Sequence, residues 1–102
     1  MNSLKTLLLV FVLLAVGCVT SPPPVNEYTL AKVAIDAAKS VDASKHSSGN
    51  FHQAMELYKK AEKLFEDREY EQAKEYFIRS RIAAEKAENS ARFIRMKTGE
   101  VL

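Results

Sequence analysis

The 102-residue sequence has few of the residues that carry most enzymatic and metal-binding chemistry: no Trp, one Cys, two His and three Gly. A single Cys excludes an internal disulfide, and three scattered glycines supply no glycine-rich phosphate loop. His46 and His52 flank an expected loop and have no Cys or carboxylate at ligand spacing, so we expect two surface residues and no metal site. The sequence therefore predicts no catalytic residues, no cofactor and no small-molecule substrate.

The chain also lacks a large excess of charge of either sign. Lys and Arg number 15 against 13 Asp and Glu, a formal net charge of +2. Nucleic-acid binding requires a clustered positive field, so we expect no nucleic-acid partner. The acidic side chains are concentrated in one stretch, where we expect a solvated face: Glu62, Glu66, Asp67, Glu69, Glu71 and Glu75.

The longest apolar run lies at the N-terminus. Met1 to Lys5 carry one positive charge, and Thr6 to Val16 are then almost wholly apolar. A positive start followed by a short apolar run is typical of a secretory signal. Because the run is shorter than the ~20 residues that a membrane-spanning helix needs, residues 1–17 are predicted to be a cleaved signal peptide.

The apolar run ends at the one cysteine of the chain. Residues 14–18 read Leu-Ala-Val-Gly-Cys and resemble the lipobox of bacterial lipoproteins. This resemblance implies cleavage between Gly17 and Cys18, and acylation of Cys18 with chains such as palmitate, which anchor the protein to a membrane. An uncleaved signal anchor with an incidental Cys is the alternative. Val19 follows the Cys in place of Asp, which by the same resemblance implies the outer membrane, with the protein facing the periplasm.

Residues 18–25 connect the predicted anchor to the rest of the chain. Pro22, Pro23 and Pro24 follow Thr20 and Ser21, and such a run favours an extended polyproline II helix. At ~3.1 Å per residue, this segment holds a folded domain about 20 Å from the lipid. The interpretation we favour is a tether, and recognition of the prolines by a partner is the alternative.

Residues 26–102 have the periodicity of helices throughout. A first helix is predicted from about Asn26 to Ala43, followed by a loop at residues 45–49. A second helix is predicted to begin at Asn50, whose side chain caps it in a box with Gln53. The apolar face expected for the first helix covers roughly half of it: Leu30, Ala34, Ala37 and Val41, flanked by Ala31, Ile35 and Ala38.

The third predicted helix is the longest, from about Tyr70 to Lys97, after a break at residues 67–69. Its apolar residues alternate at spacings of three and four, as in a coiled coil: Tyr70, Ala73, Phe77, Ser80, Ala84, Ala87, Ala91 and Ile94. Short loops between three helices predict an all-α, up-down-up bundle. A helical hairpin with one extra helix is the alternative description.

Several residues in the last two helices resemble one tetratricopeptide repeat: Leu57, Ala61, Leu64, Tyr70, Ala73, Phe77 and Ser80. The chain departs from that repeat at Arg68, where a turn glycine is usual, and at Lys60, where Leu is usual, and no Pro follows Ser80. Lipobox, proline spacer, Ala-rich helix and hairpin together resemble short bacterial lipoproteins classed under a domain of unknown function. This resemblance implies a fold and an anchor but no activity.

The third helix is predicted to extend past the second, because its residues span about 40 Å against about 25 Å. The side chains expected to meet a partner lie there and on a second stripe of the helix: Ile78, Ile82, Ala87, Ala91, Phe93, Ile94 and Met96. Apolar surface that one chain cannot cover marks an interaction site. We therefore expect a protein partner or a homo-oligomer. The function expected is an envelope scaffold or assembly factor; a structural lipoprotein that self-associates or contacts peptidoglycan non-covalently is the alternative.

Overall fold

The computed structural model describes the backbone of residues 1–16 and 21–99, and this part of the chain is helical almost throughout. Its elements are α1 (Asn2–Val16), α2 (Val25–Ser40), α3 (Ala43–His46), α4 (Ser48–Glu66) and α5 (Tyr70–Thr98). No strand occurs within the described ranges, which confirms the predicted all-α fold. None of the helices described has both the length and the hydrophobicity to cross a membrane.

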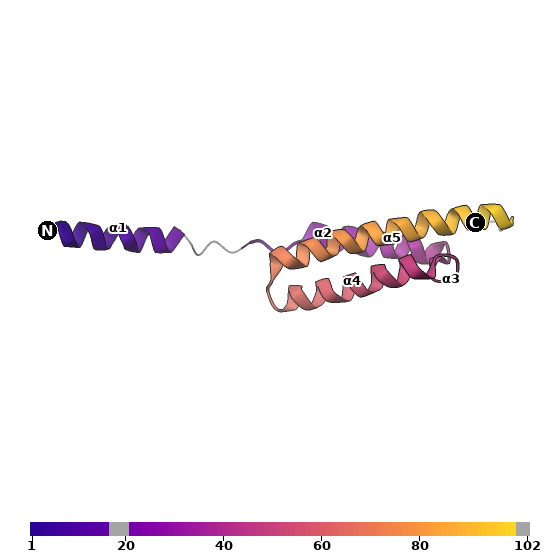
Figure 1. The fold of residues 1–102 in the computed structure, drawn as a ribbon, viewed down its shortest axis with the longest axis horizontal. Helices are drawn as coiled ribbons and strands as arrows, with labels where there is room; N and C mark the ends of the chain where they lie inside the picture. The colour runs from indigo at the N-terminus through magenta and orange to yellow at the C-terminus, as the bar shows by residue number, and fades with distance from the viewer. Residues whose placement is uncertain (17–20, 100–102) are drawn as a thin grey trace.

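The three long helices after α1 form the folded domain. α4 and α5 form an antiparallel hairpin, and α2 lies along α5 and runs parallel to it (Figure 1). The chain therefore runs up, down and up, as predicted. α2 packs mainly on α5 and touches α4 much less, which leaves a shallow groove between α2 and α4.

Alanine builds most of the core. Small side chains let helix axes approach closely, and here they line the contact along the whole length of α5. The buried alanines are Ala31, Ala34, Ala38, Ala43, Ala54, Ala61, Ala73, Ala83, Ala84, Ala87 and Ala91. Phe77 and Ser80 are the largest fully buried side chains, and both belong to the predicted seam of α5.

Aromatic rings fill the end of the domain where α2 begins. The ring of Phe77 lies 5.5 Å from that of Tyr28 and 5.7 Å from that of Tyr58, both in edge-to-face geometry. Phe65 packs edge-to-face on Tyr70 at 5.5 Å. Such pairs add to the free energy gained by burying the rings, so this cluster fixes the start of α2 on the α4–α5 hairpin.

The turn between α4 and α5 uses a left-handed residue that is not glycine. Arg68 has φ 60°. The N–H of Glu69 donates to the carbonyl oxygen of Leu64 at 2.8 Å, and the N–H of Arg68 donates to that of Phe65 at 3.1 Å. These two bonds form a Schellman motif, which usually places glycine in the left-handed position. The predicted break at residues 67–69 is confirmed.

The boundary between the first two helices of the domain differs from the prediction. α2 ends at Ser40, because Asp42 adopts a left-handed conformation (φ 55°), and the short helix α3 occupies part of the expected loop. α4 begins at Ser48, so Asn50 is not its cap. The Asn50 amide instead donates to the Ser47 hydroxyl at 3.0 Å inside the first turn. Gly49 is therefore a helical residue and does not form a loop.

The buried face of α2 lies within the predicted apolar half of the helix, centred on the residues that flank the predicted stripe. Ala31, Ile35 and Ala38 are buried together with Ala34 and Val41, whereas Leu30 is 52% exposed. Apolar residues cover about half of this helix, so the sequence alone allowed more than one face to turn inward. Packing on α5 selects the face with the small residues.

The described part of the proline segment lies against the domain. Pro24 is buried, and the Ser21 hydroxyl donates a hydrogen bond to the carboxylate of Glu71 on α5. The prolines line a surface hollow together with Tyr70 and Lys74. Residues 21–24 therefore do not form the free spacer that the polyproline pattern predicted, because the first turns of α5 hold them.

Candidate functional site

The candidate site lies on the side of α5 that faces away from the other helices. Spacings of four, eleven and three, each close to a whole number of helical turns, place Ile78, Ile82, Phe93 and Met96 on this side. We call these four residues the outer face of α5. Ile82, Phe93 and Met96 are 54%, 56% and 71% exposed, and Ile78 is half-buried. Side chains of this size are usually found inside proteins, so their exposure is informative.

The outer face consists of two separate apolar patches. Ile78 and Ile82 lie in the middle of α5, and Phe93 and Met96 lie near its end. Exposed polar residues, Glu85, Lys86 and Asn89, separate them. Phe93 also makes a cation–π contact within its own helix, because the Lys97 ammonium lies 5.4 Å from the ring centre. Each patch is therefore small and has a polar border.

Two residues expected on the partner-binding surface belong to the core instead. Ala87 and Ala91 are fully buried, packed against Ala38, Val41 and Ala43. The sequence placed them on an overhang, because the third helix was expected to be longer than the second and to extend past it. α3 and the end of α2 cover them. Ile94 is half-buried, and the end of α5 still extends beyond α3 (Figure 1).

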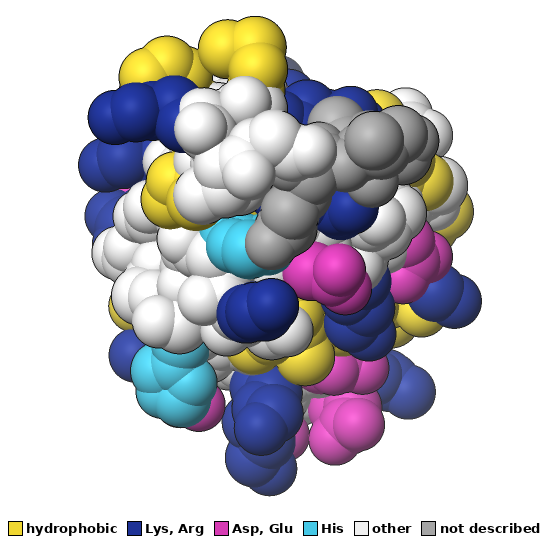
Figure 2. Space-filling model, turned by 90° about the vertical axis from the view of Figure 1, so that its right-hand side faces the viewer, with side chains coloured by type: hydrophobic (Ala, Val, Ile, Leu, Met, Phe, Trp, Pro, Cys, Tyr) yellow, Lys and Arg dark blue, Asp and Glu magenta, His cyan; other side chains and the backbone are white. Residues whose placement is uncertain are grey.

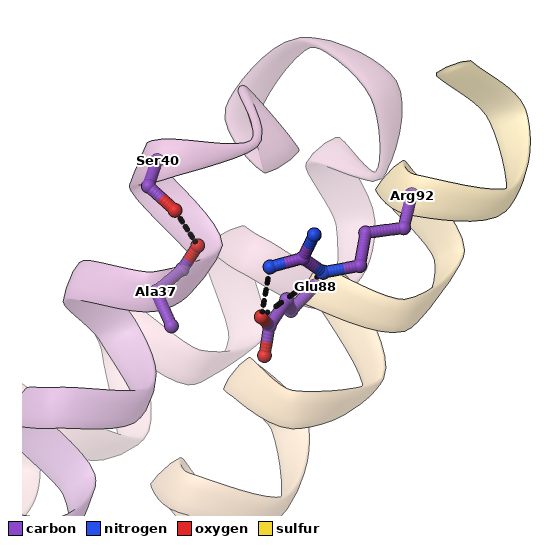
Figure 3. Close-up of polar contacts among 4 residues, drawn as sticks. All are labelled: Ala37, Ser40, Glu88 and Arg92. Carbon is purple, nitrogen blue, oxygen red and sulfur yellow. Dashed lines mark hydrogen bonds and ion pairs between the residues drawn. The ribbon is translucent and has the colours of Figure 1, made fainter. Parts of the chain in front are cut away.

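One ionic contact joins the turn after α2 to α5, and two further polar contacts lie within the two helices beside it. The Arg92 guanidinium donates to one carboxylate oxygen of Glu88 at 3.0 and 3.2 Å, close to the last turn of α2 where the Ser40 hydroxyl donates to the Ala37 carbonyl at 2.6 Å (Figure 3). Arg95 lies 3.7 Å from the carboxylate of Asp42. The part of α5 that carries Phe93 and Met96 is thus attached to the turn after α2 through Arg95.

Sequence reasoning missed exposed apolar residues on α2. Val33 is 60% exposed and Leu30 is 52% exposed. An ion pair of 3.8 Å between Glu27 and Lys74 joins α2 to α5. Leu30 lies one turn after Glu27 on α2, and Ile78 lies one turn after Lys74 on α5. Val33 could have indicated this surface, because it is an apolar residue outside the apolar face predicted for the helix.

Charge at the end of the bundle is mixed. Figure 2 views the molecule from the end that carries α3 and the last turns of α5, and basic and acidic side chains are interspersed there. Hydrophobic side chains stand out between basic ones at the upper edge of this view. An apolar patch in a charged border resembles the centre and rim of many protein interfaces.

The predicted lipidation site lies elsewhere in the chain. Gly17 and Cys18 fall outside the described residues. In the part of the chain that the structure describes, no group of three or more His, Cys, Asp or Glu is placed to hold a metal ion. His52 is exposed on α4, with its Nε2 3.9 Å from the carboxylate of Glu56, and His46 is half-buried.

The geometry defines a small all-α domain of three long helices with an alanine-rich core. The family model of a domain of unknown function, DUF4398, matches residues 26–98. This match covers most of the sequence, and the chain therefore belongs to the DUF4398 family. No curated protein and no solved structure is detectably similar to it.

Proposed function

We propose that this protein is a membrane-anchored lipoprotein whose helical domain acts as a small interaction or assembly factor at the cell envelope. The observation that carries the proposal is the exposure of Phe93 and Met96 at the end of α5. Leaving apolar surface in water costs roughly 25 cal/mol for each Å². A second protein surface that covers these side chains recovers that free energy.

The shape of the domain supports an adaptor role. The α4–α5 hairpin carries buried small residues at Ala61, Ala73 and Ser80 around the aromatic Phe77, in the order in which they resemble a tetratricopeptide repeat. Units of that kind normally stack on neighbours, because one hairpin cannot bury both of its faces. Here α2 covers one face, and the outer face of α5 is left for a partner.

The N-terminal residues support the anchor. α1 is a 15-residue helix rich in Leu and Val, and it lies apart from the bundle (Figure 1). The proposed lipid on Cys18 holds the domain at the membrane, and Val19 favours the outer membrane, with the domain facing the periplasm. Two or more acyl chains give a durable anchor, at ~0.8 kcal/mol for each buried methylene.

Replacement of the cysteine tests the anchor. In cells that make the protein, we expect the wild-type chain in the membrane fraction, with an N-terminal mass that shows lipid on Cys18. Cys18→Ser is expected to prevent lipidation and to release a processed or precursor form. A wild-type chain without lipid, or one that begins at Met1, contradicts the anchor and leaves the interaction role untouched.

Size in detergent tests the interaction. We expect wild-type protein extracted from membranes to migrate as a complex, and Phe93→Ser/Met96→Ser to migrate as a monomer. The matched control is Lys86→Ser/Asn89→Ser, which changes two exposed polar positions of the same helix. A monomer for wild type, or a complex that survives the first double variant, contradicts the proposal.

The second candidate function is structural: self-association in the envelope, or non-covalent contact with peptidoglycan. The two patches on one helix favour it, because a second copy of α5 could cover both. Mass spectrometry of the complex separates the candidates. A different protein in stoichiometric amount supports the adaptor, whereas copies of this chain or muropeptides alone support the structural role.

A further inference from the structure

A surface hollow of about 360 Å³ opens where α2 and α4 diverge, over the aromatic end of the core. It is remote from the end of α5 that carries Phe93 and Met96. All three long helices of the domain contribute to its wall. The lining residues are Val25 and Tyr28 from α2, Glu62, Phe65 and Glu66 from α4, and Phe77 from α5.

Aromatic rings form the floor of the hollow and hold one another in place. Phe77 is fully buried, so the accessible ring surface belongs to the half-buried Tyr28 and Phe65. Their ring centres lie 6.5 Å apart, and each packs on Phe77, at 5.5 and 6.5 Å. Because the rings are already ordered by the core, a ligand that binds on them need not order them first.

Two carboxylates stand on the rim. Glu62 and Glu66 lie one turn apart on α4, and both are exposed. Several other acids of the hairpin lie beside a basic side chain: Glu56 near His52, Asp67 near Lys63, and Glu85 near Arg81. Within the described residues, neither Glu62 nor Glu66 has an ion pair or a hydrogen-bond partner.

The groove around the hollow carries a negative field. Burial and a hydrogen bond with Tyr28 raise the pKa of Tyr58, and the negative charges of Glu62 and Asp36 raise it further. Lys32 and Lys39 lie on the α2 side, in the adjoining hollow that Asp36 also lines. Three carboxylates therefore face two ammonium groups along this groove, and the charged residues that line the hollow over the rings are both acidic, Glu62 and Glu66.

The rings of the hollow differ from those of Tyr76 and Phe93 in their partners. Tyr76 has the Lys60 ammonium 4.7 Å from its centre, and Phe93 has that of Lys97 at 5.4 Å. In the described part of the chain, no such cation lies over Tyr28 or Phe65. Here the protein supplies aromatic faces and carboxylates, the two groups that attract a cation, but not the cation.

We propose that this hollow binds a Lys or Arg side chain of a partner protein. The apolar stem lies against Val25 and Phe65, and the charged head lies between Glu62 and Glu66, over the ring of Tyr28. The volume is at the small end of the range for ligand pockets, about 300–1,000 Å³, which suits a single long side chain better than a larger molecule. This site is separate from the outer face of α5 and does not depend on the function of that face.

Charge complementarity selects a basic side chain over an apolar one. An apolar side chain fills the same space, but it displaces water from Glu62 and Glu66 without pairing with either carboxylate, which is unfavourable. A cation pairs with them and gains the attraction of the rings as well. The other occupants, an apolar segment or a free small cation, are distinguished by the test below.

A titration with short peptides tests the proposal. The full-length chain in detergent micelles is followed by the ring resonances of Tyr28 and Phe65 in NMR spectra. The probes are capped alanine pentapeptides with Lys, Arg or norleucine at the centre, at constant ionic strength, and free lysine amide. We expect the Lys and Arg peptides to bind with a Kd of about 1–10 mM, and the norleucine peptide at least roughly tenfold more weakly.

Two variants assign the binding to the rim and the floor. Glu62→Gln/Glu66→Gln is expected to weaken the Lys peptide about tenfold, whereas Glu56→Gln/Asp67→Asn, with the same change of charge on the same helix, leaves it unchanged. Tyr28→Leu, read from the Phe65 resonance, is expected to weaken the Lys peptide and not the norleucine peptide, because the charged head lies over the ring of Tyr28. The proposal is overturned by equal binding of norleucine and Lys peptides, by equal effects of the two double variants, by free lysine amide binding as tightly as the peptide, or by no shift of the rings with any probe.

Discussion

The hydroxyl of Ser80 donates a 2.8 Å hydrogen bond to the backbone carbonyl oxygen of Ala54, and both residues are completely buried between α5 and α4. Their positions near the middle of each helix make this bond a fixed point of the hairpin. The contact needs a side chain that is both small and polar, because the helices approach closely there and the hydroxyl has no access to water.

Substitution of Ser80 is expected to separate these two requirements. Ser80→Ala keeps the size and loses the bond, and should lower the free energy of unfolding by about 0.5–1.5 kcal/mol. Ser80→Leu overfills the contact and should lower it by more, about 3 kcal/mol. Urea unfolding followed by circular dichroism measures both. The control Ser44→Ala, at an exposed position of α3, should change little. A larger loss for Ala than for Leu contradicts the packing argument.

The left-handed turn residue Arg68 predicts a stabilising substitution. A residue with a Cβ pays a steric penalty at φ 60°, whereas glycine does not. Arg68→Gly should therefore raise the free energy of unfolding by about 0.5–1 kcal/mol. Asp42→Gly is the comparison, because Asp tolerates this conformation better and Asp42 also contacts Arg95, so its gain should be smaller or absent. Thermal unfolding of both variants tests the order.

The raised pKa of Tyr58 predicts a loss of stability at alkaline pH. In the folded chain burial and neighbouring negative charges favour the neutral phenol, whereas the unfolded chain ionises near the ordinary value of about 10. The folded state therefore binds more protons above that pH, and its stability falls as pH rises. Melting temperatures between pH 8 and 11 should decline above about pH 10. Tyr58→Phe should flatten the decline, and an identical slope in this variant contradicts the assignment.

The long helix α5 could be predicted from the sequence because its apolar residues fit one helical face only. Eight residues repeat along α5 at spacings of three and four, and the helix observed, Tyr70–Thr98, differs from the predicted one by a single residue. The break at residues 67–69 was also predicted. The Schellman motif at Arg68 was not, because it consists of backbone hydrogen bonds, which no side chain in the sequence specifies. Small size was predicted for Ser80, but its bond to Ala54 depends on how α4 approaches.

The first helix of the domain was harder to read for a physical reason. Apolar residues cover about half of α2, and contact with α5 decides which part of that half is buried: Ala31 is buried and Leu30 is not. The end of α2 and α3 together bury Ala87 and Ala91, which the sequence pattern alone assigned to an overhang. The hollow over Tyr28 and Phe65 was also beyond reach, because its walls come from three helices distant in sequence.

The exposure of Phe93 and Met96 is the basis of the proposed interaction, and site-specific cross-linking tests it most directly. A photoactivatable amino acid is placed at Met96 in cells that make the protein, and at Gln53, an exposed position of α4, as the control. We expect a discrete cross-linked adduct from Met96 and none from Gln53. Absence of an adduct at Met96, or the same adducts from both positions, contradicts it.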